Sequence, residues 1–184
     1  MDNGKSNYYR FLEGDNEAFN DIIREYGAHL ILFINGYVRN MDIAEDLMED
    51  TFCELVFHKS RLKKEESFKS YLFAIAKNKA VNYLRKSKRL TVISMDECHE
   101  NLPDEVDIEN KVIKNSDYRE LYEAMEKLCV EYRQVLYLHY FELMTYDTIA
   151  KVMNKNKNQI KNLMYRAKKE LEALLKTELK DYEK

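Results

Sequence analysis

Residues 132–171 read YRQVLYLHYFELMTYDTIAKVMNKNKNQIKNLMYRAKKEL, and this stretch indicates the fold more clearly than any other. A short helix is predicted after Thr145, which can cap it. Its apolar face would hold Ile149, Val152 and Met153. The polar turn NKN follows, and Asn156 with Gln159 then resembles a capping box at the start of a second, Lys- and Arg-rich amphipathic helix. A short helix, a tight turn and a basic helix are typical of a helix-turn-helix, although any helical hairpin could share this pattern.

The composition of the whole chain also favours helices. Its 184 residues include only four Gly and one Pro, so few residues are available for β-hairpin turns. No run approaches the ~18 to 20 consecutive apolar residues of a membrane span, and the N-terminus MDNGKSNYYR lacks the apolar segment of a signal peptide. The three cysteines form no CxxC motif. We therefore expect an all-α protein that works in the reducing cytoplasm.

Three further helices are expected upstream, each with its own start signal. Asp15 is a plausible N-cap for a long apolar pattern that forms one helix or two. Asp42, with Glu45 three residues later, resembles a capping box. Ser67 can cap a third helix after a polar loop. The inward faces would hold Phe19, Ile22, Leu30 and Phe33, then Ala44, Leu47, Met48 and Leu55, and then Phe68, Leu72, Ile75, Ala76 and Leu84.

Helical periodicity fades between about Thr91 and Asn115, where the sole proline lies among acidic residues. A segment of this length without its own pattern exceeds the usual loop, which favours a connection between two domains. We therefore expect two small helical domains, at 1–90 and 116–184, joined by an acidic linker at 91–115.

Charge is segregated along the chain, although the net charge is only −3 from 30 basic and 33 acidic residues. Residues 42–54 and 96–109 carry acidic side chains and no Lys or Arg. Residues 59–89 are strongly basic, and every charged residue in 151–169 is basic. Solvated helix faces could explain one such block, but four blocks of alternating sign predict at least two kinds of partner.

The acidic block places Leu47 and Met48 among carboxylates, an arrangement that is either a solvated face or an apolar strip suited to a basic helical partner. Two basic faces have the residue types of nucleic-acid contacts. Asn78, Asn82, Arg85 and Lys88 recur at helical spacing. Amides on such a face can read base edges while cations hold phosphates. In the last helix, side chains near the N-terminus would enter a major groove if it docks like a recognition helix.

Three segments in order resemble conserved regions 2 and 4 of a sigma-70 superfamily protein of the extracytoplasmic-function (ECF) type: DIAEDLMEDTF (42–52), FKSYLFAIAKNKAVNYLRKSKR (68–89) and the stretch at 132–171. The resemblance covers nearly the whole chain and implies region 2 in 1–90 and a helix-turn-helix region 4 in 116–184. It implies a promoter-specificity subunit that binds core RNA polymerase, recognises −35 and −10 elements and directs transcription initiation. The implied partners are core enzyme and promoter DNA, with an anti-sigma factor as an optional third, and no cofactor or small-molecule substrate. The linker would be a flexible tether or a mimic of RNA in the polymerase.

The resemblance also implies three sets of contact residues. Core polymerase would contact Asp42, Glu45, Asp46, Leu47, Glu49 and Asp50. The −10 element would contact Arg61, Lys63, Lys64, Ser67, Asn78, Asn82, Arg85, Lys88 and Arg89. The −35 element would contact Lys155, Lys157, Asn158, Gln159, Lys161, Asn162, Arg166 and Lys168. Within the last set, Arg166 and Lys168 are expected at phosphates, and Gln159 is either a base contact or a helix cap.

Catalysis is not expected from this sequence. The four histidines form no HExxH motif, the Cys98-His99 pair alone does not make a metal site, and no glycine-rich phosphate loop is present. Two rival interpretations remain. A stand-alone helix-turn-helix regulator would need neither the acidic 42–54 helix nor a second basic region. A helical adaptor that binds only proteins would lack the salt-dependent affinity for DNA.

Overall fold

The computed structural model describes residues 3–58, 67–90 and 116–182. Every regular element in these ranges is helical, which confirms the all-α fold class for the described part of the chain. Cα positions group into two compact units, Met1–Ile93 with Asp147–Lys155 and Ser94–Tyr146 with Asn156–Lys184. The expected linker at 91–115 lies outside the described residues, and the domain boundaries at its two ends stay a prediction.

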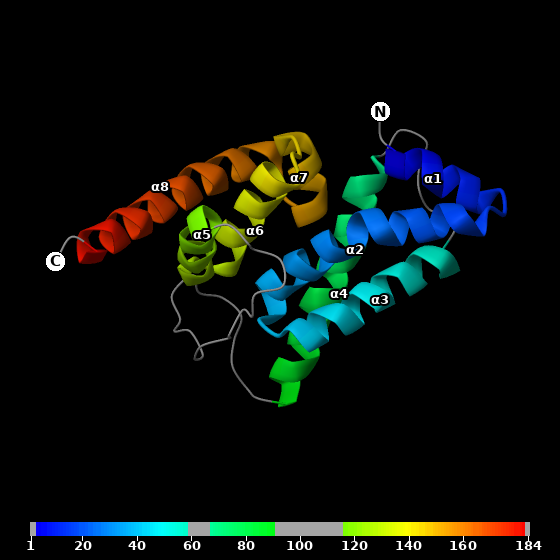
Figure 1. Ribbon diagram of the computed structural model, residues 1–184, viewed down its shortest axis with the longest axis horizontal. Helices are drawn as coiled ribbons and strands as arrows, with labels where there is room; N and C mark the ends of the chain where they lie inside the picture. The colour runs from blue at the N-terminus through cyan, green and yellow to red at the C-terminus, as the bar shows by residue number, and fades with distance from the viewer. Residues whose placement is uncertain (1–2, 59–66, 91–115, 183–184) are drawn as a thin grey trace. The chain divides into compact units, whose positions relative to one another are not determined.

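The first four helices are α1 (Asn3–Leu12), α2 (Asn16–Val38), α3 (Met41–Phe57) and α4 (Phe68–Leu90). Of these, α1, α3 and α4 pack around α2 (Figure 1). Helix α2 contacts the other three, and α4 also contacts α1 and α3. The sequence patterns predicted α2, α3 and α4 but not α1. The acidic helix and the basic helix α4 therefore share one hydrophobic core.

The helix starts follow local capping chemistry. The Asp15 carboxylate accepts hydrogen bonds from the backbone N–H groups of Glu17 and Ala18, at 3.1 and 3.3 Å, so the predicted N-cap of α2 is confirmed. Helix α2 then runs without a break to Val38. The predicted start of α3 at Asp42 is wrong. Asn40 is the N-cap, because its side chain accepts the Ile43 N–H at 3.0 Å, and Asp42 lies in the first turn, where its charge favours the helix dipole.

Aromatic rings form the centre of this four-helix core. Phe68 is fully buried, and its ring centroid lies 5.1 Å from that of Tyr8 and 5.7 Å from that of Tyr26. Phe33 and Phe73 join α2 to α4 at 5.0 Å between ring centroids. Such offset and edge contacts add to the free energy gained from burying apolar area.

Ring packing also explains a glycine in the first helix. A Cβ atom on Gly4 would meet the hydroxyl end of the Tyr26 ring, so a side chain at residue 4 would require this ring to shift.

The second group of elements contains α5 (Ser116–Lys127), α6 (Val130–Leu136), the π-helical turn η1 (Tyr137–Phe141) and α8 (Lys157–Tyr182). Helix α8 packs on α6 and α5. The buried Arg133 guanidinium closes the end of α5, since it donates hydrogen bonds to the carbonyl oxygens of Met125, Glu126 and Leu128 at 3.0, 2.8 and 2.9 Å. The last carbonyl groups of a helix lack N–H donors from a following turn, so the guanidinium supplies donors here, and the Leu128 N–H also donates to the Met125 carbonyl at 3.2 Å.

Helix α7 (Tyr146–Met153) and the turn at 154–156 precede α8. Asn154 has a φ of +54°, a left-handed conformation that asparagine tolerates better than most residues. The predicted capping box is confirmed: the Asn156 side chain accepts the Gln159 N–H, and the Gln159 side chain accepts the Asn156 N–H, both at 2.8 Å. The predicted order of short helix, turn and long basic helix is therefore present.

Candidate nucleic-acid and protein interfaces

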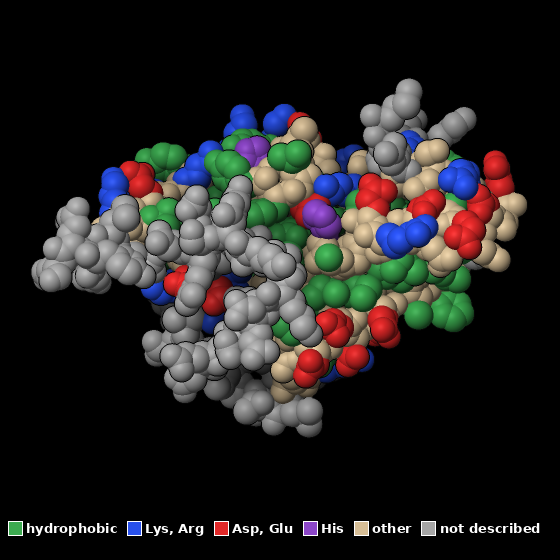
Figure 2. Space-filling view, viewed as in Figure 1, with side chains coloured by type: hydrophobic (Ala, Val, Ile, Leu, Met, Phe, Trp, Pro, Cys, Tyr) green, Lys and Arg blue, Asp and Glu red, His purple; other side chains and the backbone are tan. Residues whose placement is uncertain are grey.

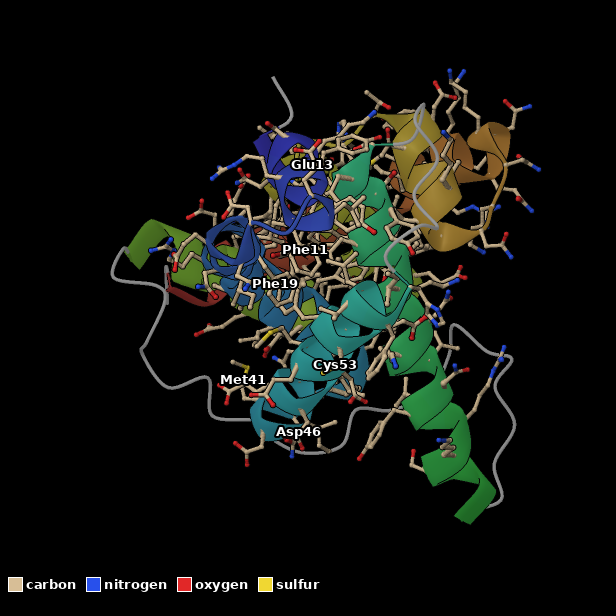
Figure 3. The ribbon with its side chains drawn as sticks, turned by 90° about the vertical axis from the view of Figure 1, so that its right-hand side faces the viewer. Phe11, Glu13, Phe19, Met41, Asp46 and Cys53 are labelled. Atoms are coloured by element: carbon tan, nitrogen blue, oxygen red, sulfur yellow. The ribbon has the colours of Figure 1, made fainter. Side chains whose placement is uncertain are left out.

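Five carboxylates make up the acidic face of α3. They are Asp42, Glu45, Asp46, Glu49 and Asp50, and all five side chains are exposed. Their spacing of three and four residues places them along one side of the helix. Figure 2 shows acidic side chains gathered over α3, beside a band of apolar side chains, and Figure 3 shows Asp46 on the outer side of the same helix. This surface presents closely spaced negative charge to solvent.

Leu47 does not belong to the exposed acidic face. Its side chain is only 9% exposed and faces the core with Ala44 and Leu55, because residues three, four and eight positions apart share one side of a helix. Met48 is half-buried. The large apolar side chain that α3 does expose is Phe57, at 82%. Sequence reasoning missed Phe57, although its position one turn beyond Cys53, on the polar side of the helix, could have indicated exposure.

An ion pair joins the acidic helix to the basic helix. The Lys79 ammonium lies 2.9 Å from a Glu54 carboxylate oxygen, between α4 and α3. Both side chains are partly exposed, so we expect a modest contribution to stability. The pair helps to hold α3 and α4 in a fixed relative orientation, which sets the directions of their outer faces.

The basic face of α4 is present where the structure describes it. Asn78, Asn82 and Arg85 are exposed and recur at i, i+4 and i+7, as predicted. Ser67 is half-buried and lies immediately before the helix. Arg61, Lys63 and Lys64 lie outside the described residues, and so do the side chains of Lys88 and Arg89.

Lys77 adds positive charge beside this face. Its side chain is half-buried, and burial lowers the pKa of its ammonium, with the nearby Arg85 cation lowering it further. Burial is the larger cause of this shift, and repulsion from the Arg85 cation is the smaller one. An anion bound there would relieve the repulsion.

The N-terminal half of α8 presents the predicted polar side chains to solvent. Lys157, Asn158, Lys161 and Asn162 are all exposed. The opposite side of the helix is anchored by Ile160 and Met164, which are 0% and 2% exposed. Lys155, in the turn, is half-buried. Gln159 is exposed but its side-chain oxygen serves the helix cap, which supports the second of its two predicted roles.

Arg166 and Lys168 are exposed further along α8, as expected of phosphate contacts. The structure adds two tyrosines that the sequence reasoning missed. Tyr165 is 71% exposed and follows Lys161 by one helical turn, a spacing that could have revealed it. Tyr140, in η1, is 51% exposed, and its ring centroid lies 5.3 Å from the Lys168 nitrogen.

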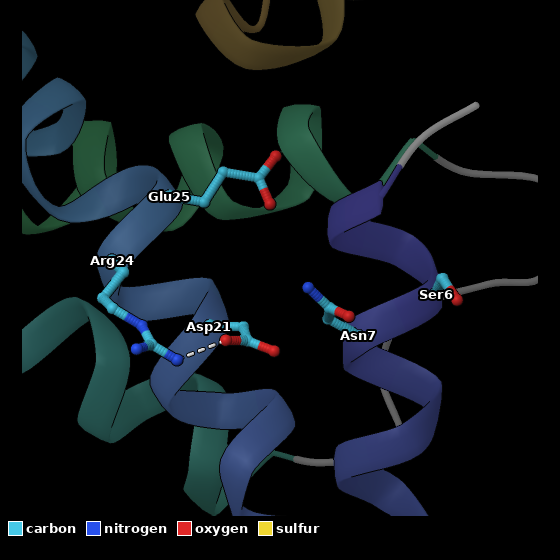
Figure 4. A pocket seen from close by; sticks show the side chains of 5 residues that line it. All are labelled: Ser6, Asn7, Asp21, Arg24 and Glu25. Carbon is cyan, nitrogen blue, oxygen red and sulfur yellow. Dashed lines mark hydrogen bonds and ion pairs between the residues drawn. The ribbon is translucent and has the colours of Figure 1, made fainter.

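One polar hollow of about 490 Å³ lies between α1 and α2 (Figure 4). Ser6 and Asn7 line it from α1, and Asp21, Arg24 and Glu25 line it from α2. Arg24 is paired with Asp21 across one turn. The hollow is wide open and holds none of the predicted site residues.

Metal sites and membrane spans were also considered for the described residues. No three His, Cys, Asp or Glu side chains there gather closely enough to hold a metal ion. No helix in the same ranges combines the length and the apolar character needed to cross a bilayer.

Family models match both halves of the chain. The model described as Sigma-70 region 2 matches residues 8–90, and that described as Sigma-70, region 4 matches residues 118–171. Together they cover about three quarters of the sequence and contain every described residue of the three candidate contact sets. A match to both regions separates this chain from a stand-alone helix-turn-helix regulator and from an adaptor that binds only proteins.

Curated relatives agree with the family models. The chain is 29% identical over 136 residues to the RNA polymerase sigma factor SigV of Bacillus subtilis, covering 73% of this chain and 76% of SigV. It is 27% identical over 161 residues to the ECF RNA polymerase sigma factor SigM of the same species, covering 85% of this chain and 94% of SigM.

Two solved structures share the fold. CnrH, determined in complex with the cytosolic domain of CnrY, aligns with a TM-score of 0.67 at 18% identity, over 95% of this chain and 98% of CnrH. The sigma factor RpoE from Bartonella quintana, determined with the anti-sigma factor NepR, aligns with a TM-score of 0.65 at 21% identity, over 86% of this chain and 96% of RpoE. The family models and relatives predict the same regions in the same order as the sequence patterns. The chain belongs to the sigma-70 family of RNA polymerase sigma factors, in its extracytoplasmic-function group.

Proposed function

We propose that this promoter-specificity subunit divides its work among three helices. The acidic face of α3 binds core RNA polymerase, the basic face of α4 binds the −10 element, and the N-terminal half of α8 binds the −35 element. The domain containing α1–α4 extends over 1–90, and the −35 domain over 116–184. The chain acts in the cytoplasm, where it directs initiation without catalysing a reaction of its own.

The separation of charge carries this proposal. The acidic face of α3 repels DNA phosphates and attracts a basic protein surface, whereas the exposed cations of α4 and α8 do the reverse. One helix core thus supports two surfaces of opposite sign, since α3 and α4 pack together and each buries an apolar side. A protein that binds only DNA has no use for the negative surface.

The polymerase contact is tested by charge reversal on α3. Asp46→Lys with Glu49→Lys should weaken binding to core enzyme at least about tenfold, because two attractive contacts become repulsive. Glu17→Lys with Glu25→Lys is the matched control, since both residues are exposed acids of α2 outside the acidic face. Binding would be measured by titration with purified core polymerase, and circular dichroism would check helicity. Equal loss in both double variants would attribute the effect to net charge and contradict the assignment.

The −10 contact is tested on α4. Asn82→Ala removes an amide from the exposed face, and each specific base contact discriminates by about 1–3 kcal/mol. Transcription from a library randomised in the −10 element should therefore lose preference at one position. An unchanged preference, with normal core binding, would exclude Asn82 from base recognition.

The −35 contact separates sequence readout from charge. Asn158→Ala and Lys161→Ala should change which −35 sequences are preferred, because both residues lie on the exposed side of the first turns of α8. Lys168→Ala should weaken all promoters alike and reduce the dependence of affinity on salt by about one unit. Transcription from a randomised −35 library distinguishes the two behaviours. Identical preferences in all variants would place the −35 contact elsewhere.

A third partner is proposed from the relatives. RpoE was determined in complex with an anti-sigma factor, and this chain shares its fold. We propose that an anti-sigma protein binds this chain too and covers its DNA-binding faces. Purification from the native host under non-inducing conditions should yield a complex. Recovery of the chain with no associated protein would count against this partner.

A further inference from the structure

A tyrosine from η1 meets a lysine from α8 at the surface of the −35 domain. The Lys168 nitrogen lies over the Tyr140 ring, 5.3 Å from its centroid. Interaction with the Tyr140 side chain is the main cause of a raised Lys168 pKa. Tyr140 is 51% exposed, and both polar groups are open to solvent.

The backbone holds Tyr140 in place. The preceding His139 has its Nδ1 atom 3.0 Å from the Met144 carbonyl oxygen, which accepts a hydrogen bond from the Nδ1–H tautomer. The His139 ring contacts Tyr140 at 4.9 Å and Tyr146 at 5.2 Å between centroids. The wide turn of η1, closed by Glu142 N–H to the Tyr137 carbonyl at 3.2 Å, sets the direction of these side chains.

Given the −35 contact of α8 proposed above, we infer that Tyr140 and Lys168 form a phosphate clamp on promoter DNA. The ammonium lies against the tyrosine ring, and the exposed phenol O–H donates a hydrogen bond to a phosphate oxygen. The ammonium supplies the charge, and the tyrosine fixes where that charge lies. A free lysine side chain loses rotamer freedom when it binds, and a preformed pair has already lost part of it. Tyr140 is therefore a positioning residue as well as a direct contact.

The chemistry separates this pair from a base contact. Phosphates carry no sequence information, so removal of the clamp should weaken all promoters equally. The phenol carries no charge, so its removal should leave the number of released counterions unchanged. These two properties together distinguish Tyr140 from Asn158, which should change sequence preference, and from Lys168, which should change the salt dependence.

The test uses the full chain bound to core polymerase and compares Tyr140→Phe, Lys168→Ala and the double variant. Tyr140→Phe retains the ring and should weaken promoter binding by about threefold to tenfold, the range for one lost hydrogen bond, with an unchanged salt slope and unchanged −35 preference. Lys168→Ala should reduce the salt slope by about one unit. The double variant should lose less than the product of the two single effects, because both side chains hold the same phosphate. Tyr9→Phe, on a partly exposed tyrosine of α1, is the matched control and should bind as the parent does.

The outcomes separate this inference from the proposed function. No effect of Lys168→Ala would contradict the phosphate role of α8 itself. A normal effect of Lys168→Ala with none from Tyr140→Phe, or effects of the two variants that multiply, would overturn only the clamp. A changed −35 preference in Tyr140→Phe would also overturn it. Thermal unfolding of Tyr140→Phe, which keeps every apolar atom of the ring, checks that the domain remains folded.

Discussion

The helices α1–α4 pack through buried aromatic rings, whereas α5, α6, η1 and α8 pack through buried side chains that are mostly aliphatic, such as Leu136 and Ile160, and add a buried arginine at the end of α5. Phe68 contacts rings from α1 and α2, so three helices meet on one side chain. In the second group, Arg133 closes α5 from within α6, and a capping box starts α8. The proposed polymerase surface thus lies on a core rich in aromatic rings. The proposed −35 surface lies on an aliphatic core whose helix ends are also held by hydrogen bonds.

The largest expected effect breaks the aromatic core. Phe68→Ala should lower the free energy of unfolding by about 3–5 kcal/mol, since a fully buried ring is replaced by a cavity. Phe57→Ala is the control, because its side chain is 82% exposed and should change stability by less than about 0.5 kcal/mol. Denaturant titration followed by circular dichroism measures both. If the two variants lost similar free energies of unfolding, the aromatic core would not be what stabilises α1–α4.

The next largest expected effect concerns the hydrogen bonds that Arg133 makes at the end of α5. Arg133→Lys keeps the charge but replaces a planar group that serves three carbonyls with a single ammonium. We expect a loss of about 2–3 kcal/mol, as for hydrogen bonds from a buried charged group. The same exchange at Arg24, which is exposed, should cost less than about 0.5 kcal/mol. If Arg133→Lys were as mild as Arg24→Lys, hydrogen bonding at the end of α5 would not be what holds α5 and α6 together.

A pH titration sharpens the comparison within α1–α4. Tyr8 is fully buried, and burial raises the pKa of its phenol to about 12, with Tyr71 and Tyr9 adding to the shift. The unfolded chain loses this proton from pH 10 upward, whereas the folded chain keeps it until about pH 12. Stability is therefore complete below pH 10 and falls across this window by about 1.4 kcal/mol per pH unit from this group alone.

Tyr8→Phe removes the group responsible and should make the stability curve flatter between pH 10 and 12. The same variant at pH 7 gives the contribution of the hydroxyl group in its neutral state, which is subtracted. Denaturant titration at pH 9, 10 and 11 measures the slope. Equal slopes for the parent and Tyr8→Phe would show that water reaches this phenol in the folded state.

Much of the fold could be predicted because its signals are local. The Asp15 cap, the Asn156–Gln159 box and the spacing of Asn78, Asn82 and Arg85 each depend on neighbours within one or two helical turns. Helix α1 was missed, although its buried residues Gly4, Tyr8 and Phe11 follow helical spacing. Its sequence NGKSNYYRFL is short and mostly polar, and its packing depends on Tyr8 meeting Phe68, which lies sixty residues away in the chain.

In the candidate site, too, some features could be predicted from local spacing and others could not. The exposed carboxylates of α3 and cations of α8 follow from helical spacing, and so does the inward position of Leu47, which was predicted with Ala44 and Leu55 and is confirmed. The second prediction for Leu47, as part of an apolar strip that contacts polymerase, does not fit this burial. By contrast, Tyr140 meets Lys168 only because η1 and α8 are brought together by the packing of α6 on α8. Contacts between distant residues depend on tertiary structure, which a pattern of neighbours does not contain.

The smallest predicted effect has the opposite sign and concerns the turn after η1. Leu143 has a φ of +54°, a conformation that costs a residue with a Cβ atom about 1–2 kcal/mol, and its side chain is 82% exposed, so little packing offsets this strain. The turn is held by the Met144 N–H, which donates to the Leu138 carbonyl at 3.0 Å, and this bond does not depend on the side chain of residue 143. Leu143→Gly relieves the strain but adds freedom to the unfolded chain, which cancels about 0.5–1 kcal/mol of the gain.

We therefore expect Leu143→Gly to stabilise the protein by about 0.5 kcal/mol, measured as a higher denaturant midpoint with an unchanged slope. Asn154→Gly is the control, since asparagine already tolerates its φ of +54° and should gain less. A loss of stability in Leu143→Gly alone would show that this leucine packs on the scaffold after all.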